Sequence, residues 1–186
     1  RYLVRTPSRS DVRSQWVGLR PLVRPDRAAG GATRAISREH TVQVSPSGLL
    51  TVTGGKWTTY RAMAEDVLAH CIQQGLLGTE KTGLRRGVTT NLRLVGAPQA
   101  PAGNDLGQPP GLHLYGAEAE AIQALPGADR HLGGGLTEAM VRFAAREEYA
   151  RTVEDVLARR SRLLFLDARL AARLSGEVAV LLRQET

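Results

Sequence analysis

A stretch rich in glycine and proline, from about residue 79 to residue 110, divides this 186-residue chain into two parts of different character. Such residues interrupt helices and strands. We therefore predict a linker at residues 79–111, between a first domain at residues 1–78 and a second at residues 112–186. The stretch includes Gly96-Ala-Pro98, Pro101, Gly103 and Pro109-Pro110-Gly111.

The first part combines a β-hairpin with a helix. Residues 40–44 (HTVQV) and 49–53 (LLTVT) alternate as half-buried strands do, and the SPSG between them is typical of a turn. Gly54-Gly55 ends the second strand. A helix is predicted to follow and to end near Gly75, because apolar residues recur three and four positions apart. A short strand is also predicted at residues 16–23, leading into a loop at 25–35. The apolar positions of the helix are Tyr60, Met63, Ala64, Val67, Leu68, Cys71 and Ile72.

The second part is predicted to be helical to its end. Thr137 can cap one helix, Thr152-Val-Glu-Asp155 has the form of a capping box, and Asp167 can cap the last helix. The predicted fold class is α+β: a fragment of an FAD and substrate domain, made of a hairpin plus a helix, followed by a small all-helical C-terminal domain. The apolar stripe of the last helix is Leu170, Ala171, Leu174, Val178, Leu181 and Leu182.

The chain is basic, with a formal charge of +7 and a pI of about 10.4. Nucleic-acid binding is not predicted, because arginine is spread along the chain among carboxylates and aromatic residues make up only 4%. The densest basic runs, at 81–86 and 159–162, are typical of solvated helix ends or loops. A small anionic substrate or anionic lipid head groups account for the charge with fewer assumptions.

Cysteine usage and hydropathy limit the kinds of site and the cellular location that the chain can be expected to have. Cys71 is the single cysteine, so neither an intrachain disulfide nor a cysteine-rich metal site can form, and a cytoplasmic protein is predicted. No His, Asp or Glu spacing indicates a metal site. No run approaches the roughly 20 apolar residues that cross a bilayer, so any membrane contact is expected to be peripheral. A start at Arg1 rather than methionine indicates a fragment or a processed chain.

Residues 49–60 (LLTVTGGKWTTY) carry the one arrangement that resembles a binding site: strand, two glycines, lysine, helix. Glycines let a ligand approach the backbone, and the start of a helix offers free N–H groups and the positive end of its dipole. A Walker P-loop is excluded, because Leu50 stands where its first glycine belongs and Trp57 where Ser or Thr belongs. A tight strand-to-helix turn without a ligand stays open as the alternative.

Three ordered motifs resemble the FAD-dependent, aerobic, membrane-associated glycerol-3-phosphate dehydrogenases, which are flavoproteins related to D-amino-acid oxidase. The motifs are GLRPLV at 18–23, SREHTV at 37–42 and GGKWTTYR at 54–61. Residues 136–139 (LTEA), 146–149 (REEY) and 152–160 (TVEDVLARR) are similar to that family's C-terminal domain. The resemblance therefore covers both parts of the chain and identifies it as a C-terminal portion.

The resemblance implies roles for several residues. Arg20 and Arg38 correspond to the arginines that bind the glycerol-phosphate moiety, and guanidinium forks match phosphate oxygens. Lys56 corresponds to the lysine beside substrate and flavin, where positive potential favours the reduced cofactor. The implied flavin-contacting residues are Gly54, Gly55, Lys56, Trp57 and Thr58.

Two parts of the family's machinery have no counterpart here. Its dinucleotide-binding fingerprint and its catalytic histidine lie upstream of the part that this chain resembles. Gly133-Gly-Gly135 lacks the spacing of that fingerprint and a predicted strand before it, although a helix follows. No catalytic residue is therefore assigned, and the isolated chain is expected to be inactive and without bound FAD. None of the four histidines (His40, His70, His113 and His131) matches the catalytic one, although His40 follows the Arg38 motif.

The reaction that the resemblance implies is oxidation of sn-glycerol 3-phosphate to dihydroxyacetone phosphate. FAD accepts the hydride, and a quinone is the expected electron acceptor, at the inner face of the cell membrane. Two alternatives stay open: a related FAD-dependent glycerol-phosphate oxidase, and a helical module for oligomerisation or membrane docking. Unpaired strand edges also leave open a homo-oligomer.

Overall fold

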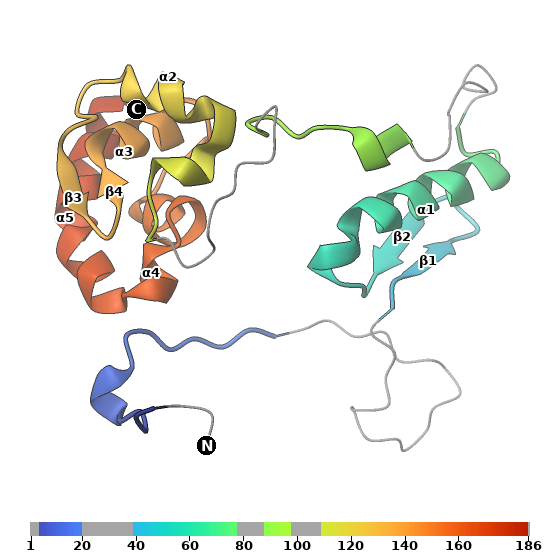
Figure 1. Cartoon of the computed structure of the whole chain (residues 1–186). Coiled ribbons are helices and arrows are strands. Elements are labelled where there is room, and N and C mark those ends of the chain that lie inside the picture. Colours follow the sequence, from blue (N-terminus) through green and yellow to red (C-terminus); the bar gives the residue numbers. More distant parts are fainter. Residues whose placement is uncertain (1–3, 20–38, 78–87, 98–108, 186) are drawn as a thin grey trace. The chain divides into compact units, whose positions relative to one another are not determined.

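The computed structural model describes residues 4–19, 39–77, 88–97 and 109–185 (Figure 1). The chain forms two compact units. One comprises residues 18–92 and the other comprises residues 1–17 together with residues 93–186. The two units are described separately below.

A two-stranded antiparallel hairpin opens the described part of the first unit. Strands β1 (Thr41–Val44) and β2 (Leu50–Thr53) pair from Thr41 opposite Thr53 to Val44 opposite Leu50. The Gly48 N–H donates to the Ser45 carbonyl at 2.9 Å, and Gly48 has φ +83°. The predicted hairpin and its turn are thus confirmed.

Helix α1 (Tyr60–Gln73) follows the hairpin, after one 3₁₀ turn, η3 (Trp57–Thr59). It ends as predicted, with Gly75 at φ +65° just beyond it. A second 3₁₀ turn, η5 (Val88–Asn91), is joined to it by a hydrogen bond of 3.1 Å from Arg61 to Thr89. The predicted apolar stripe exists but is only partly covered, since no residue of α1 is buried. A two-stranded hairpin is too small to cover one face of a four-turn helix.

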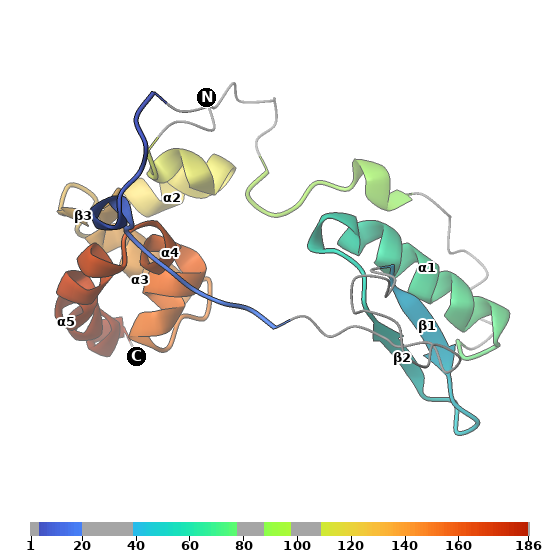
Figure 2. The same ribbon diagram turned by 90° about the horizontal axis from the view of Figure 1, so that it is seen from below.

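The second unit holds the main core (Figures 1 and 2). Fully burying one aliphatic side chain contributes about 1.5–3 kcal/mol, so this unit supplies most of the hydrophobic stabilisation within the described residues. Its largest fully buried side chains are Ile122, Val141, Val156 and Val178. Its elements are η6 (Leu112–Glu118), α2 (Ala119–Gln123), β3 (His131–Gly133), β4 (Leu136–Thr137), α3 (Glu138–Arg146), the π-helix η7 (Asp155–Arg160), α4 (Leu163–Leu166) and α5 (Ala168–Glu185).

The three predicted caps are present. The Thr137 hydroxyl accepts a hydrogen bond from the Met140 N–H at 3.3 Å. Thr152 and Asp155 form a reciprocal box, in which each backbone N–H donates to the other's side chain, at 2.9 and 3.1 Å. Asp167 Oδ1 accepts from the Leu170 N–H at 2.9 Å. These bonds satisfy donors that helix starts leave unpaired.

One feature of this unit departs from the prediction of an all-helical domain. Strands β3 and β4 form a short antiparallel hairpin around Gly133-Gly-Gly135, so a strand does precede these glycines. All three glycines have positive φ. A β-carbon at Gly135 would lie only 1.8 Å from the Pro110 carbonyl oxygen. The glycine run therefore serves a tight turn against residue 110. The overall class, α+β with a mainly helical second part, is confirmed.

The N-terminal segment also differs from its predicted place. The Ser14 hydroxyl donates to the Leu164 carbonyl at 2.7 Å and accepts from the Ala168 N–H at 2.9 Å, so residues 13–16 contact the helical unit, to which residues 1–17 belong (Figure 2). Residues 16–19 form no strand. Instead, the Trp16 ring lies edge-on against Phe165, with centroids 5.1 Å apart. Residues 20–23 of the predicted strand, and the predicted loop at 25–35, lie outside the described residues.

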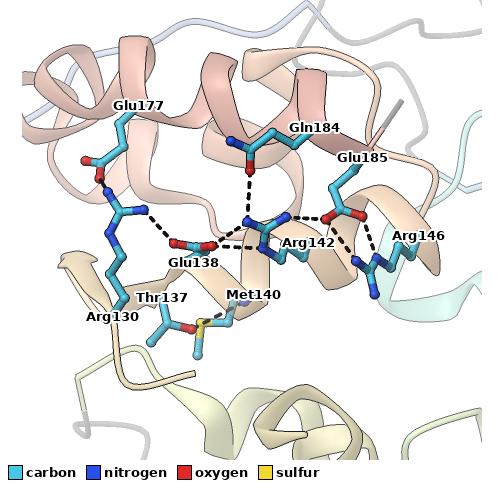
Figure 3. Close-up of polar contacts among 9 residues, drawn as sticks. All are labelled: Arg130, Thr137, Glu138, Met140, Arg142, Arg146, Glu177, Gln184 and Glu185. Atoms are coloured by element: carbon cyan, nitrogen blue, oxygen red, sulfur yellow. Dashed lines mark hydrogen bonds and ion pairs between the residues drawn. The ribbon is translucent and has the colours of Figure 1, made fainter. Parts of the chain in front are cut away.

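An ion-pair network joins α3 to α5 (Figure 3). Glu138 accepts hydrogen bonds from Arg130 and Arg142, while Glu185 accepts from Arg142 and Arg146. The Glu138 and Glu185 side chains are 9% and 6% exposed, so both carboxylates depend on these arginines for their hydrogen bonds.

Candidate functional site

Lys56 lies at the turn between β2 and α1, where the sequence predicts a site. The two glycines before it have φ +78° (Gly54) and +81° (Gly55). A β-carbon at Gly54 would lie 2.5 Å from the Glu39 carbonyl oxygen, and one at Gly55 would lie 2.6 Å from the Met63 sulfur. Any other residue would thus be strained at both positions. The turn itself accounts for both glycines, in agreement with the tight-turn alternative.

The helix start beside this turn has no side-chain cap. Neither Lys56 before η3 nor Thr59 before α1 caps the N–H groups with its side chain. The Thr59 hydroxyl instead donates to the Lys56 carbonyl at 3.0 Å. The first N–H groups of this helix start and the positive end of its dipole therefore lie next to Lys56 in the chain. No ion pair to Lys56 is found within the described residues. Together these groups favour an anion.

A cavity of about 570 Å³ opens at this helix start. Its volume falls within the range of small-molecule sites, roughly 300–1,000 Å³. Both polar and apolar side chains line it, so it suits a ligand with an anionic edge and an apolar body. The lining residues are Glu39, His40, Gly55, Lys56, Thr59, Ala62 and Met63.

His40 occupies the wall of this cavity and is held by α1. Its Nε2 lies 2.8 Å from Asp66 Oδ2, and its Cβ is packed close to Gly55. The Asp66 backbone carbonyl also pairs with His70 Nδ1 at 2.9 Å. From the sequence it was clear only that His40 follows the Arg38 motif, and its partner Asp66 was not predicted. Asp66 lies on the polar side of the helix stripe, where a solvated carboxylate is the usual expectation.

The other residues predicted to form the site fall into two groups, those that the structure describes and those that lie outside the described residues. Trp57 is 86% exposed, and its ring stacks on Tyr60 with centroids 5.5 Å apart. Thr58 is exposed in the same 3₁₀ turn. Gly54, Gly55, Lys56, Trp57 and Thr58 are thus together at one helix start. Arg20 and Arg38 lie outside the described residues, so the structure does not test their predicted roles.

Other classes of site were sought in the described ranges. No group of three or more His, Cys, Asp or Glu side chains there could hold a metal ion. Likewise, none of the helices seen in those ranges has the length and apolar character needed to cross a bilayer.

Comparison with known proteins places both units in one family. The model of the C-terminal domain of alpha-glycerophosphate oxidase matches residues 111–186. A mitochondrial glycerol-3-phosphate dehydrogenase of Arabidopsis thaliana is 35% identical over 95% of this chain and 32% of its own length. Glycerol-3-phosphate dehydrogenase 1 of Mycobacterium tuberculosis is 40% identical over 82% of this chain and 31% of its own length.

The mitochondrial glycerol-3-phosphate dehydrogenase of Schizosaccharomyces pombe is 32% identical over 100% of this chain and 35% of its own length. The chain thus spans about a third of the length of these curated relatives. The matches include residues on both sides of the glycine- and proline-rich stretch. The chain therefore belongs to the glycerol-3-phosphate dehydrogenase family, and its residues 111–186 correspond to that family's C-terminal domain.

Proposed function

We propose that this chain is part of a flavoprotein that oxidises sn-glycerol 3-phosphate to dihydroxyacetone phosphate. In this reaction a hydride leaves C2 of the substrate and the C2 hydroxyl loses its proton. The observation that carries the proposal is the cationic helix start at Lys56, in a chain whose relatives are named glycerol-3-phosphate dehydrogenases. The chain alone is proposed to be inactive, since it spans about a third of those relatives.

The Lys56 site fits one edge of a flavin. FAD, when bound, supplies the hydride acceptor of the reaction. The Lys56 ammonium and the N–H groups at the start of η3, which no side chain caps, would stabilise negative charge that develops on the pyrimidine side of the flavin ring. The exposed Trp57 ring offers an apolar surface beside them. Gly54 and Gly55 would contribute backbone without side chains, and Thr58 a hydroxyl. These five residues are the proposed cofactor contacts within this chain.

The substrate's phosphate is assigned to two arginines. Arg20 and Arg38 stand in the two motifs that precede the Lys56 turn, and a guanidinium binds phosphate through two parallel hydrogen bonds. Lys56 is proposed to act in both places, next to the substrate and next to the cofactor. Glu39 and His40, which directly follow Arg38, line the same cavity as Lys56.

A peripheral contact with the inner face of the cell membrane, and a quinone as electron acceptor, complete the proposal. An exposed apolar patch on the helical unit favours the membrane contact. It consists of Trp16, Leu164, Phe165 and Leu166, each at least 36% exposed. Exposed Arg162 and Arg169 flank residues 164–166 in the sequence and are the proposed contacts for anionic head groups. The same patch is the feature on which the alternative function, a docking or oligomerisation module, would rest.

The test uses the protein extended to the full length of its relatives. We expect it to purify with bound flavin, whose absorbance bleaches when glycerol 3-phosphate is added without oxygen. A bound flavin that does not bleach would reject this substrate, and absence of flavin would reject the flavoprotein proposal. Reoxidation by a quinone analogue, compared with reoxidation by oxygen, then separates dehydrogenase from oxidase. Co-sedimentation with phosphatidylglycerol vesicles, with Phe165→Ser as the variant, tests the patch.

A further inference from the structure

The helical unit contains a second cavity, which has no part in the proposed oxidation. It has a volume of about 450 Å³ and lies among residues 94–97, η6, the glycine turn at 134–135 and the end of η7. This volume is also within the range of small-molecule sites.

The walls of this cavity are held by close backbone contacts. The Ala117 N–H donates to the Gly96 carbonyl at 2.9 Å, which fixes residues 94–97 to η6. Gly135 lies so close to Pro110 that no side chain could be accommodated there. On the other side, Arg160 Nε donates to the Glu148 backbone carbonyl at 3.0 Å and ties the end of η7 to that residue. The cavity is therefore part of the packed unit.

Two carboxylates in the wall lack hydrogen-bond donors. Glu148 Oε2 is buried and accepts no hydrogen bond, although the side chain as a whole is 31% exposed, and it forms a long ion pair of 3.9 Å with Arg160 Nε. For Glu118, too, no donor is found among the described residues. An unpaired buried polar atom costs free energy, about 1–3 kcal/mol in typical cases, so its presence beside a cavity calls for a donor from outside the chain.

The electrostatics of the wall agree with this reading. Burial raises the pKa of Glu148; Arg160 opposes this effect, and the Glu118 carboxylate adds to it. Burial and the charge of Glu148 raise the pKa of Tyr115 to about 12. The lining of the cavity includes two carboxylates, Glu118 and Glu148, and one guanidinium, that of Arg160. Its other walls are apolar, with Leu94, Leu136 and Met140 among them.

We propose that this cavity binds a small organic cation, a primary ammonium on a short apolar tail, with the ammonium held by Glu148 and Glu118. A primary ammonium brings three donors and a positive charge to two carboxylates that lack both. The tail would replace water against the apolar side chains. A metal ion is not proposed, because no group of three or more His, Cys, Asp or Glu side chains in the described ranges could hold one.

The experiment titrates the ¹⁵N-labelled 186-residue chain with n-butylammonium chloride, with 1-butanol as the neutral probe of similar length. We expect saturable shifts of the Gly96, Gly134 and Gly135 amide signals with the ammonium and not with the alcohol. Glu148→Gln should weaken binding by at least about tenfold, since a charged hydrogen bond is lost. The matched control is Glu154→Gln, which changes an exposed glutamate already paired with Arg159.

Stability gives a second readout that separates a site from a structural role. Glu148→Gln removes a partly buried charge whose only ion pair, with Arg160, is long and has no hydrogen bond, so its urea midpoint should equal or exceed that of the unmodified chain even as binding is lost. Should this variant fail to fold, Glu118→Gln carries the test, with the same expected loss of binding. Shifts that do not saturate, equal shifts with butanol, or unchanged ammonium binding by the folded glutamine variants would each overturn the proposal.

Discussion

Glu138 and Arg142 lie one turn apart on α3, and Arg142 Nε donates to Glu138 Oε1 at 2.9 Å (Figure 3). Arg142 also reaches Glu185 near the end of α5, 43 residues further along the chain, so one guanidinium connects the carboxylates of Glu138 and Glu185. Its side chain is only 14% exposed. Water therefore cannot readily replace it, and the packing of α5 on α3 depends on this arginine.

Arg142→Met is expected to lower the free energy of unfolding of the helical unit by about 2–3 kcal/mol. Methionine keeps the side-chain volume but leaves two buried carboxylates short of donors, and breaking such pairs is costly. The control is Arg159→Met, a half-exposed arginine that pairs with the exposed Glu154 and with Asp155; it should cost about 0–1 kcal/mol. Urea unfolding followed by circular dichroism measures both. Equal losses of unfolding free energy would show that the network contributes no more stability than the ion pairs of Arg159.

The same network predicts acid sensitivity. Hydrogen bonds from Arg130 hold the pKa of Glu138 below its usual value, with Arg142 adding to the effect, and those from Arg146 do the same for Glu185. A carboxylate with a lowered pKa in the folded state stabilises the fold above its unfolded-state pKa, near 4.3. That stability is lost as the pH falls through the folded-state pKa. The urea midpoint should thus be level above about pH 5 and fall below about pH 4.

Asp155 adds to this dependence from the start of η7. Backbone hydrogen bonds from Arg151 and Thr152 lower its pKa to about 2. Because a carboxylate accepts these bonds more strongly than a neutral acid or an amide does, Asp155→Asn should destabilise the chain at pH 7 and flatten the decline between pH 4 and pH 2. Urea midpoints of both chains across this range provide the measurement. Parallel pH profiles would mean that Asp155 does not act as a charged cap.

Local signals predicted the local structure well. The alternation at 40–53 and the SPSG turn determine a hairpin, and Thr137, Thr152 and Asp167 cap helices because each bonds within three residues of itself. Positions that depend on distant partners were not predictable. Ser14 packs on Leu164, 150 residues away, and Gly133-Gly-Gly135 is typical of a loop until Pro110 is known to lie against it. In the candidate site, Lys56 followed from its motif, whereas Asp66 behind His40 did not.

Lys56→Met in the full-length protein should make flavin reduction less favourable. The ammonium stands at a helix start without a side-chain cap, where it would stabilise the anionic reduced flavin. A loss of ~1–2 kcal/mol corresponds to a decrease of about 20–40 mV for a two-electron couple. Lys81→Met, in the glycine- and proline-rich stretch, is the control. An unchanged potential in a spectroscopic redox titration would remove Lys56 from the cofactor site.

Arg38→Ala in the full-length protein should raise the KM for glycerol 3-phosphate by about 10- to 100-fold and leave the flavin content unchanged. Loss of a charged hydrogen bond to phosphate, about 1.5–3 kcal/mol, gives this range. Arg183→Ala, an exposed arginine on α5, serves as the control. Steady-state kinetics measure the KM, and the ratio of flavin to protein absorbance measures the flavin content. An unaltered KM would exclude Arg38 from substrate binding, while flavin loss would point to a structural role.

Two glycine-to-alanine substitutions should have different effects. Gly54→Ala should impair flavin binding, whereas Gly176→Ala should raise the stability of the helical unit. Gly54→Ala places a β-carbon 2.5 Å from the Glu39 carbonyl at a φ of +78°, so the turn that presents Lys56 must shift, and the full-length protein should lose bound flavin. Gly176→Ala lies within α5, where nothing stands within 4 Å of the added carbon. Alanine there should stabilise the helix by about 0.5–1 kcal/mol and leave flavin content intact. Flavin absorbance and urea midpoints measure the pair. A Gly54→Ala protein that retains its flavin would show that the Lys56 turn tolerates displacement, and the proposed cofactor contact would then have to be placed elsewhere.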